Sequence, residues 1–180
     1  MKLWRCYNAP SIFVNRISQP VRSLENQLGD LLRKGSLKLA TAESCTGGLI
    51  ADRLTDIPGS SDYFLGGVVA YAYEAKVALL EVSWETLQKF GAVSRETVLE
   101  MARGARRALS ADLAVSVSGI AGPAGGLPDK PVGTTWLGLS APTGEWARKF
   151  VWDNDRRANK QLSADAALQF LIDYLNGQVE

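Results

Sequence analysis

Residues 111–120 are the feature that most constrains the fold of this chain. The run is almost continuously apolar and empties into a loop rich in glycine and proline at 121–133. Runs of this length and composition are typical of strands buried on both faces, as in parallel sheets that helices cover from two sides. We therefore expect a central strand here, with an α/β architecture around it.

A second unit of this kind lies earlier in the chain. Residues 37–42 alternate like a short strand, the polar and glycine-rich segment 43–48 follows, and a helical pattern resumes at Leu49. Strands and helical segments alternate along the chain, which predicts one three-layer α/β/α domain with a central sheet, mixed because of a carboxy-terminal hairpin. The expected helices are 23–32, 74–80, 84–90, one capped by Ser94 and 159–175; the other expected strands lie within 63–73 and at 134–139 and 146–152.

The chain contains no histidine, and this absence restricts its chemistry. Ser-His-Asp catalysis, Cys-His catalysis and His-ligated metal sites are excluded, so a hydrolase with this sequence needs a different base. Twenty basic and nineteen acidic side chains give a net charge of +1, which offers no general footprint for nucleic acid or an anionic membrane. The two cysteines, Cys6 and Cys45, favour a reducing compartment over a disulfide framework and argue against zinc.

The length of 180 residues suits one domain, which we expect at 23–180. No apolar run approaches the roughly 20 residues of a membrane-spanning helix, and the amino terminus lacks the apolar segment of a secretory signal. We therefore expect a cytoplasmic protein. Residues 1–22 are an amino-terminal extension to which the sequence assigns no role. Its basic, acid-free composition also resembles that of a transit peptide.

Two loops have the features of a ligand site. Residues 43–48 and 118–123 each follow a predicted strand, and open α/β sheets bind ligands at the carboxyl ends of strands, near helix amino termini. Neither loop has the ending of a P-loop or the spaced glycines of a dinucleotide fingerprint, which disfavours a nucleotide triphosphatase. Taken alone, each loop also fits an ordinary turn in which serine, threonine and glycine serve as caps.

Six short segments form a more specific combination. They are TAESCTGG at 41–48, IPGSSDYF at 57–64, YAYEAK at 71–76, GAVS at 91–94, SGIAGPAGG at 118–126 and KPVGTTW at 130–136. With these segments the chain resembles the CinA carboxy-terminal domain family from the first predicted helix onward. The resemblance implies an amidase of pyridine nucleotide recycling, which converts nicotinamide mononucleotide and water to nicotinic acid mononucleotide and ammonia. It implies no metal or organic cofactor.

Ser44 is the leading candidate for the nucleophile, and Ser61 is its rival. An unactivated serine is a poor nucleophile, and without histidine the leading candidate for the base is Lys76. A lysine accepts a proton only when it is neutral, so its ordinary pKa of ~10.4 must fall through burial or nearby positive charge. The sequence does not decide which serine lies nearest Lys76, and as bare residues such serines are ordinary helix caps and such lysines are ordinary solvated groups.

Further groups would complete the site. Tyr71 could relay or orient the proton, although an isolated tyrosine in a strand is more often structural. The backbone N–H groups of Thr46 and Gly47 could stabilise the oxyanion, an effect worth about 3 kcal/mol per donor in other hydrolases. Cys45 lies in the same loop, but it has no histidine to activate it and is more simply a small buried residue.

Substrate contacts are expected from the second loop and from the last helix. Ser118 and Gly119 would lie around the ribose or the ring of the nucleotide. The resemblance assigns the phosphate to Arg156, which occupies the place of an arginine that follows an acidic residue in related sequences. At a later position where the family leads us to expect arginine, this chain has Lys160, which can neutralise phosphate but cannot form a bidentate fork.

Two other functions remain open at this stage. One is a non-catalytic, competence-associated binding or interaction module, and the other is an amidase for a different amide such as nicotinamide. The expected partner is a small nucleotide substrate, not nucleic acid or a membrane. Apolar surface on the helices or the hairpin could also support a homodimer.

Overall fold

The computed structural model describes residues 22–179. The predicted extension at 1–22, including Cys6 and the transit-peptide interpretation, lies outside the described residues except for Arg22. Within the described range, each helix is too short or too polar to cross a membrane.

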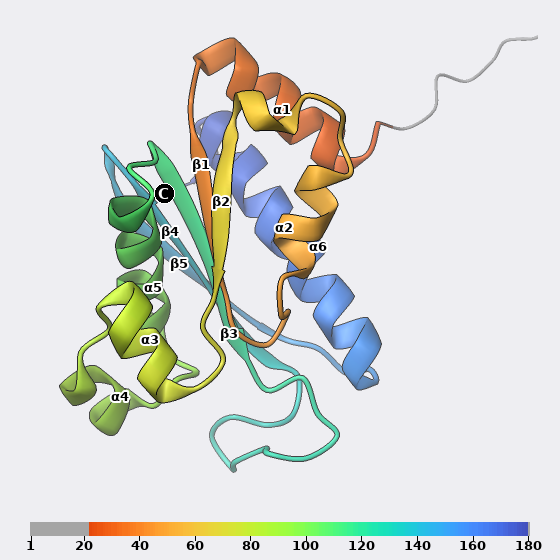
Figure 1. Cartoon of the computed structure of the whole chain (residues 1–180). Coiled ribbons are helices and arrows are strands. Elements are labelled where there is room, and N and C mark those ends of the chain that lie inside the picture. The colour runs from red at the N-terminus through yellow and green to blue at the C-terminus, as the bar shows by residue number, and fades with distance from the viewer. Residues whose placement is uncertain (1–21, 180) are drawn as a thin grey trace, which may run out of the picture.

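A five-stranded sheet forms the centre of the domain, in the order β2-β1-β3-β4-β5 (Figure 1). The antiparallel pairing of β4 with β3 and β5 confirms both the mixed sheet and the predicted hairpin. The apolar run predicted as a buried strand is β3, which lies in the middle of the sheet and is almost entirely buried. The strands are β1 (Leu39–Glu43), β2 (Phe64–Val69), β3 (Leu113–Gly119), β4 (Thr134–Ala141) and β5 (Gly144–Val151), with β1 parallel to both β2 and β3.

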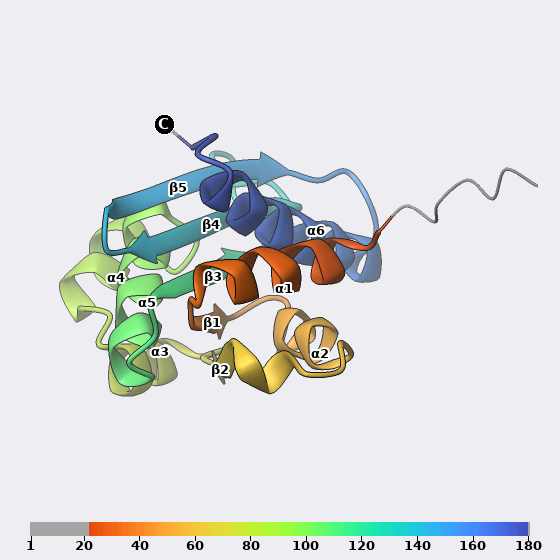
Figure 2. The same cartoon turned by 90° about the horizontal axis from the view of Figure 1, so that it is seen from above.

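Helices cover both faces of the sheet, as the view along the layers shows (Figure 2). One face carries α1 (Leu24–Gly35), α2 (Leu49–Thr55) and α6 (Arg156–Leu175), and the other carries α3 (Tyr73–Leu80), α4 (Trp84–Phe90) and α5 (Arg95–Ala108). Alternate residues of β3 belong to two separate hydrophobic clusters, one on each face of the sheet. Val115 is in the cluster that contains Phe170 of α6, and Ala114 is in the cluster that contains Met101 of α5. The predicted three-layer α/β/α domain is therefore confirmed.

Two glycines allow α5 to pack closely against its neighbours. A Cβ atom on Gly104 in α5 would lie 1.9 Å from the carbonyl oxygen of Leu80, at the end of α3. A Cβ atom on Gly138 in β4 would lie 2.4 Å from the carbonyl oxygen of Val98 in α5. Because no side chain fits at either position, glycine sets the spacing of α3, α5 and the sheet. This spacing holds Lys76, which lies on α3, close to the strand ends.

Two differences from the predicted boundaries affect the candidate site. Helix α6 begins at Arg156, earlier than the predicted residue 159, because the Asp155 side chain caps it by accepting from the Ala158 N–H at 2.9 Å. Strand β2 ends at Val69, so Tyr71 lies in the connection to α3 and not in the strand. Both corrections concern residues at the edge of the candidate site.

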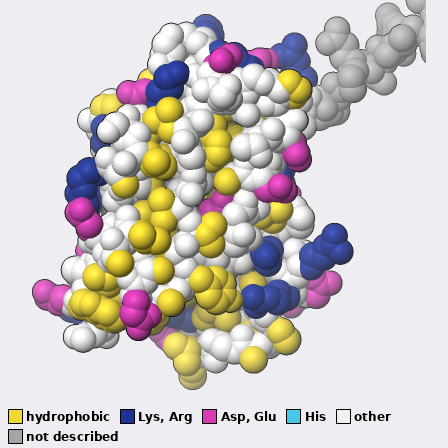
Figure 3. Space-filling model, in the orientation of Figure 1, with side chains coloured by type: hydrophobic (Ala, Val, Ile, Leu, Met, Phe, Trp, Pro, Cys, Tyr) yellow, Lys and Arg dark blue, Asp and Glu magenta, His cyan; other side chains and the backbone are white. Residues whose placement is uncertain are grey.

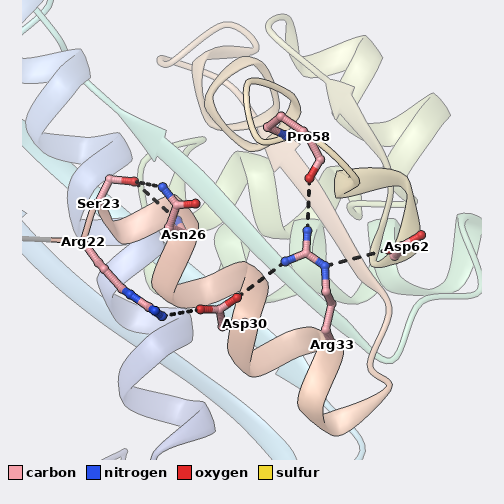
Figure 4. Close-up of polar contacts among 7 residues, drawn as sticks. All are labelled: Arg22, Ser23, Asn26, Asp30, Arg33, Pro58 and Asp62. Atoms are coloured by element: carbon pink, nitrogen blue, oxygen red, sulfur yellow. Dashed lines mark hydrogen bonds and ion pairs between the residues drawn. The ribbon is translucent and has the colours of Figure 1, made fainter.

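Polar side chains join α1 to the segment that precedes β2 (Figure 4). Ser23 caps α1 by accepting from the Asn26 N–H at 3.4 Å. Arg33 donates to the carbonyl oxygen of Pro58 at 3.3 Å and lies 3.8 Å from a carboxylate oxygen of Asp62. The segment 58–62 is therefore held beside α1, at the edge of the sheet where β2 begins.

Exposed apolar side chains gather over β2 and α3, on the face that Figure 3 shows. They are Leu65, Val69, Tyr71, Tyr73 and Leu79. Strand β2 is also an edge strand, and unpaired edge strands with apolar neighbours are suited to contact with another chain. The homodimer stays a prediction.

Candidate functional site

The carboxyl ends of the three parallel strands meet at one edge of the sheet and enclose a small cavity. Ser44 follows β1, Tyr71 lies shortly after β2, and Ser118 and Gly119 end β3. The cavity has a volume of about 210 Å³. Its other lining residues are Cys45, Lys76, Ala92, Val93, Ala121 and Arg156. The structure thus brings together residues from both loops that the sequence singled out.

Ser44 and Lys76 are in direct contact inside this cavity. The Lys76 ammonium nitrogen Nζ lies 2.9 Å from Ser44 Oγ, although the two residues are 32 positions apart in the chain. Lys76 is completely buried, and Ser44 is 7% exposed. Nζ also donates to the backbone carbonyl oxygens of Ala70 at 2.8 Å and Tyr71 at 3.0 Å. The two carbonyl oxygens hold the amine beside the serine hydroxyl.

The surroundings of Lys76 disfavour its charged form. All three of its hydrogen-bond acceptors are neutral oxygens. Burial lowers the pKa of Lys76 from an ordinary value of 10.5 to about 8. About a tenth of the amine is therefore neutral at pH 7, and the neutral form that a general base requires becomes the major one above pH 8.

Tyr71 contributes to this arrangement through its backbone. Its carbonyl oxygen accepts from Lys76, whereas its hydroxyl group accepts from the Arg156 guanidinium at 3.2 Å. The Tyr71 side chain is 62% exposed, at the mouth of the cavity. Tyr71 was predicted to relay or orient the proton; its main-chain carbonyl contacts Lys76, whereas its phenol faces Arg156.

The loop between β1 and α2 is closed by internal hydrogen bonds. The Gly47 N–H donates to the Ser44 carbonyl oxygen at 3.1 Å, and the Gly48 N–H donates to the Glu43 carboxylate at 2.9 Å. The Gly47 N–H is therefore occupied by the turn, which argues against the oxyanion contact predicted for it. Within residues 22–179, neither the Thr46 N–H nor the Cys45 N–H donates to a backbone carbonyl oxygen.

Glu43 is a residue of the site that the sequence reasoning missed. Its side chain is 1% exposed and accepts hydrogen bonds from the Thr46 hydroxyl and from the first turn of α2. The available signal was an acidic residue at the end of a buried strand, ahead of a helix whose N-cap position is Gly48. A glycine offers no side-chain oxygen for capping, so an oxygen from elsewhere is needed.

Ser61 lies far from Lys76. It belongs to the short 3-10 helix Ser60–Asp62, which precedes β2, and it is exposed. Strands β1 and β2 are parallel. A residue that precedes β2 therefore lies at the amino ends of the strands, whereas a residue that follows β1 lies at their carboxyl ends. The geometry therefore favours Ser44 over Ser61 as the partner of Lys76.

Cys45 is buried beside the two central residues. It packs into the larger hydrophobic cluster and is 6% exposed. Burial raises the pKa of its thiol to about 11, which keeps it protonated and a poor nucleophile near neutral pH.

Basic side chains at the amino end of α6 form the rim of the cavity. Arg156 donates to the Gly122 carbonyl oxygen at 2.7 Å, which fixes it to the loop that follows β3. Lys160, one helical turn later, lies close to Gly47, with its Nζ 3.8 Å from the position that a Cβ on Gly47 would take. A neighbouring depression of about 370 Å³ is lined by Arg156, Lys160, Leu49, Gln161 and Arg157, of which the sequence predicted only Arg156 and Lys160 as site residues.

Asn159 fixes the position of this rim. It is 1% exposed and donates to the carbonyl oxygens of Ala121, at 3.1 Å, and Asn154, at 2.9 Å. The amino end of α6 is thereby joined to the wall of the cavity. In residues 22–179, no cluster of three or more Cys, Asp or Glu side chains is placed to hold a metal ion.

The chain is similar to proteins named for competence or for CinA. Residues 21–175 match the family described as the CinA C-terminal domain. CinA-like proteins from Salinibacter ruber and Chloroherpeton thalassium are 50% identical over 147 residues and 49% identical over 157 residues. The matches cover 82% and 85% of this chain but 36% and 37% of the relatives. The chain thus spans little more than a third of the length of these relatives.

Solved structures of similar length have the same fold. The competence/damage inducible protein CihA from Agrobacterium tumefaciens is 42% identical with a TM-score of 0.80, and the match covers 85% of this chain and 95% of that chain. A CinA superfamily protein from Klebsiella pneumoniae is 32% identical with a TM-score of 0.83, over 86% of this chain and 96% of that chain.

Proposed function

The chain belongs to the family of CinA C-terminal domains, and on this premise we propose that it is an amidase that hydrolyses nicotinamide mononucleotide. The observation that carries the proposal is the contact of 2.9 Å between Ser44 Oγ and Lys76 Nζ inside the cavity. Among residues 22–179, this lysine has no carboxylate partner. Structural lysines usually lie at the surface or pair with an acid. A buried lysine with a lowered pKa, hydrogen-bonded to a serine, is instead suited to activate that serine.

The first half of the reaction forms an ester. Neutral Lys76 takes the hydroxyl proton of Ser44 while Oγ attacks the carboxamide carbon of the substrate. The negative charge on the substrate oxygen is met by the N–H groups of Thr46 and Cys45, in place of the predicted pair of Thr46 and Gly47. Protonated Lys76 then delivers its proton to the amide nitrogen, the carbon–nitrogen bond breaks, and ammonia leaves.

The second half consumes one water molecule. Lys76, neutral again, takes a proton from water as the water oxygen attacks the ester carbon. The bond between carbon and Ser44 Oγ then breaks, Oγ regains a proton from Lys76, and nicotinic acid mononucleotide is released. The sum is one amide and one water giving one acid and one ammonia, with Ser44 and Lys76 restored.

The substrate lies with its pyridine ring in the cavity and its phosphate toward α6. Ser118 and Gly119 form the wall on the β3 side, near the ring and the ribose. Arg156 borders both the cavity and the neighbouring basic depression, so it is placed to contact the phosphate, and Lys160 adds charge there.

Arg156→Ala is expected to lower kcat/KM for nicotinamide mononucleotide by about 10-fold to 30-fold, because a charged hydrogen bond to phosphate is lost. The same variant should hydrolyse nicotinamide riboside, which has no phosphate, at the rate of the parent. Ammonia release from both substrates measures this, with the double variant Ser44→Ala, Lys76→Ala as the blank. Equal losses with nucleotide and nucleoside would contradict the phosphate assignment.

A non-catalytic interaction module is the alternative function. Relatives bear names that refer to competence and damage induction, and this chain matches only part of the length of the longer ones. The two functions differ in one assay. Saturable binding of nicotinamide mononucleotide, with ammonia release no higher than in the blank, would favour the module.

A further inference from the structure

Glu43 is buried beside the reactive serine without a positive partner. It is the last residue of β1 and directly precedes Ser44. Its carboxylate belongs to none of the ion pairs formed among residues 22–179. Burying an uncompensated charge is costly, so its hydrogen bonds must replace the lost water.

Four donors surround this carboxylate. One oxygen accepts from the Thr46 hydroxyl at 2.7 Å, the Gly48 N–H at 2.9 Å and the Ile50 N–H at 3.1 Å. The other oxygen accepts from the Ala51 N–H at 2.9 Å. Three of the donors are backbone groups at the start of α2, which helix geometry leaves without partners inside the helix. Glu43 thus caps α2 from the far side of the loop that carries Ser44.

The cap fixes the loop at both ends. Ser44 is held on the strand side, where its N–H donates to the Val117 carbonyl oxygen at 3.0 Å. On the helix side, the loop is held through Glu43. Ser44 Oγ keeps its distance of 2.9 Å from Lys76 only while the loop keeps this shape.

The cap also closes the amino end of α2 to the substrate. A glycine-rich turn between a strand and a helix is the usual place for a nucleotide phosphate, because the helix N–H groups face outward there. In this chain the N–H groups of Gly48, Ile50 and Ala51 are already bound by the internal carboxylate. A phosphate is therefore directed away from α2, toward Arg156 and Lys160 of α6.

We propose that Glu43 is a positioning residue: its carboxylate caps α2 and thereby holds the Ser44 loop in its reactive shape. The expected effect on turnover rests on the amidase function proposed above. The expected effect on the melting temperature does not rest on it, so the role of Glu43 and the amidase function can fail separately.

The experiment uses Glu43→Ala, with sodium formate as a small replacement carboxylate. We expect kcat to fall roughly 30-fold with KM within about threefold of the parent, because the loop loses its anchor while the substrate contacts remain. Formate should raise both the kcat and the melting temperature of Glu43→Ala, and it should change neither in the parent. Glu85→Ala removes an exposed glutamate from the first turn of α4 and is the control, for which no response to formate is expected.

Glu43→Gln keeps the shape of the side chain, so it provides a second test if Glu43→Ala does not fold. It should lose about tenfold in kcat and should not respond to formate, because the amide fills the space and presents an N–H group to a donor. Formate that changes neither the kcat nor the melting temperature of Glu43→Ala, or a kcat of Glu43→Gln equal to that of the parent, would overturn the proposal. If the parent releases no ammonia, the melting temperatures alone decide whether Glu43 holds the loop.

Discussion

Ser44→Ala is expected to lower the rate of ammonia release from nicotinamide mononucleotide by roughly 10³-fold or more, because no other described hydroxyl is hydrogen-bonded to Lys76. The KM of any residual activity should stay near that of the parent, since the phosphate contacts are on α6. Steady-state ammonia release with both purified proteins measures the loss.

Ser61→Ala is the matched control for this prediction. It replaces an exposed serine at the opposite edge of the sheet, and its rate should stay within about twofold of the parent. Circular dichroism and melting curves establish that both variants are folded. A large loss in Ser61→Ala combined with a small loss in Ser44→Ala would contradict the assignment of the nucleophile.

The kcat/KM of the parent is expected to rise about tenfold for each pH unit below pH 8 and to level off above it. The sign follows from the role of Lys76: the base must be neutral, and burial lowers its pKa to about 8, so the reactive fraction grows as the pH rises. Measurements between pH 6.5 and 9.5 bracket this transition while staying above the second ionisation of a phosphate, near pH ~6.

A second substrate, nicotinamide riboside, distinguishes the titration of Lys76 from the titration of the substrate in this pH profile. Without a phosphate it has no ionisation in this range, so the same transition near pH 8 should be seen with both substrates. A flat profile with both substrates would exclude Lys76 as the base. A transition seen with the nucleotide alone would assign the titration to the substrate and not to the enzyme.

Most of the fold was predictable because its local signals agree with its tertiary packing. The apolar run at 111–120 corresponds to β3, which is buried on both faces, and Ser94 caps α5 by accepting from the Thr97 N–H at 3.2 Å. The start of α6 was placed too late, because its first turn carries polar residues that show no apolar periodicity. The cap that sets its start, Asp155, was visible in the sequence but was not used.

The two central residues were predicted, but the sequence left open whether Ser44 or Ser61 lies next to Lys76. Ser44 and Lys76 belong to different elements, and they meet because β2 lies beside β1 in parallel and brings the start of α3 to the same edge. Strand order cannot be read from periodicity, which is why Ser61 remained a rival. Local hydrogen bonds in the loop were also not predictable from the sequence. Gly47 was expected to bind the oxyanion, but its N–H donates to the Ser44 carbonyl oxygen within the turn.

Covalent trapping tests the central claim most directly. Purified protein is mixed with nicotinamide mononucleotide, quenched in acid within the first turnover and digested, and the peptides are analysed by mass spectrometry. We expect the nicotinate nucleotide as an ester on the peptide that contains Ser44, absent from Ser44→Ala and accompanied by one ammonia per ester. An ester on Ser61, a thioester on Cys45, or ammonia release from Ser44→Ala at the rate of the parent would contradict the account.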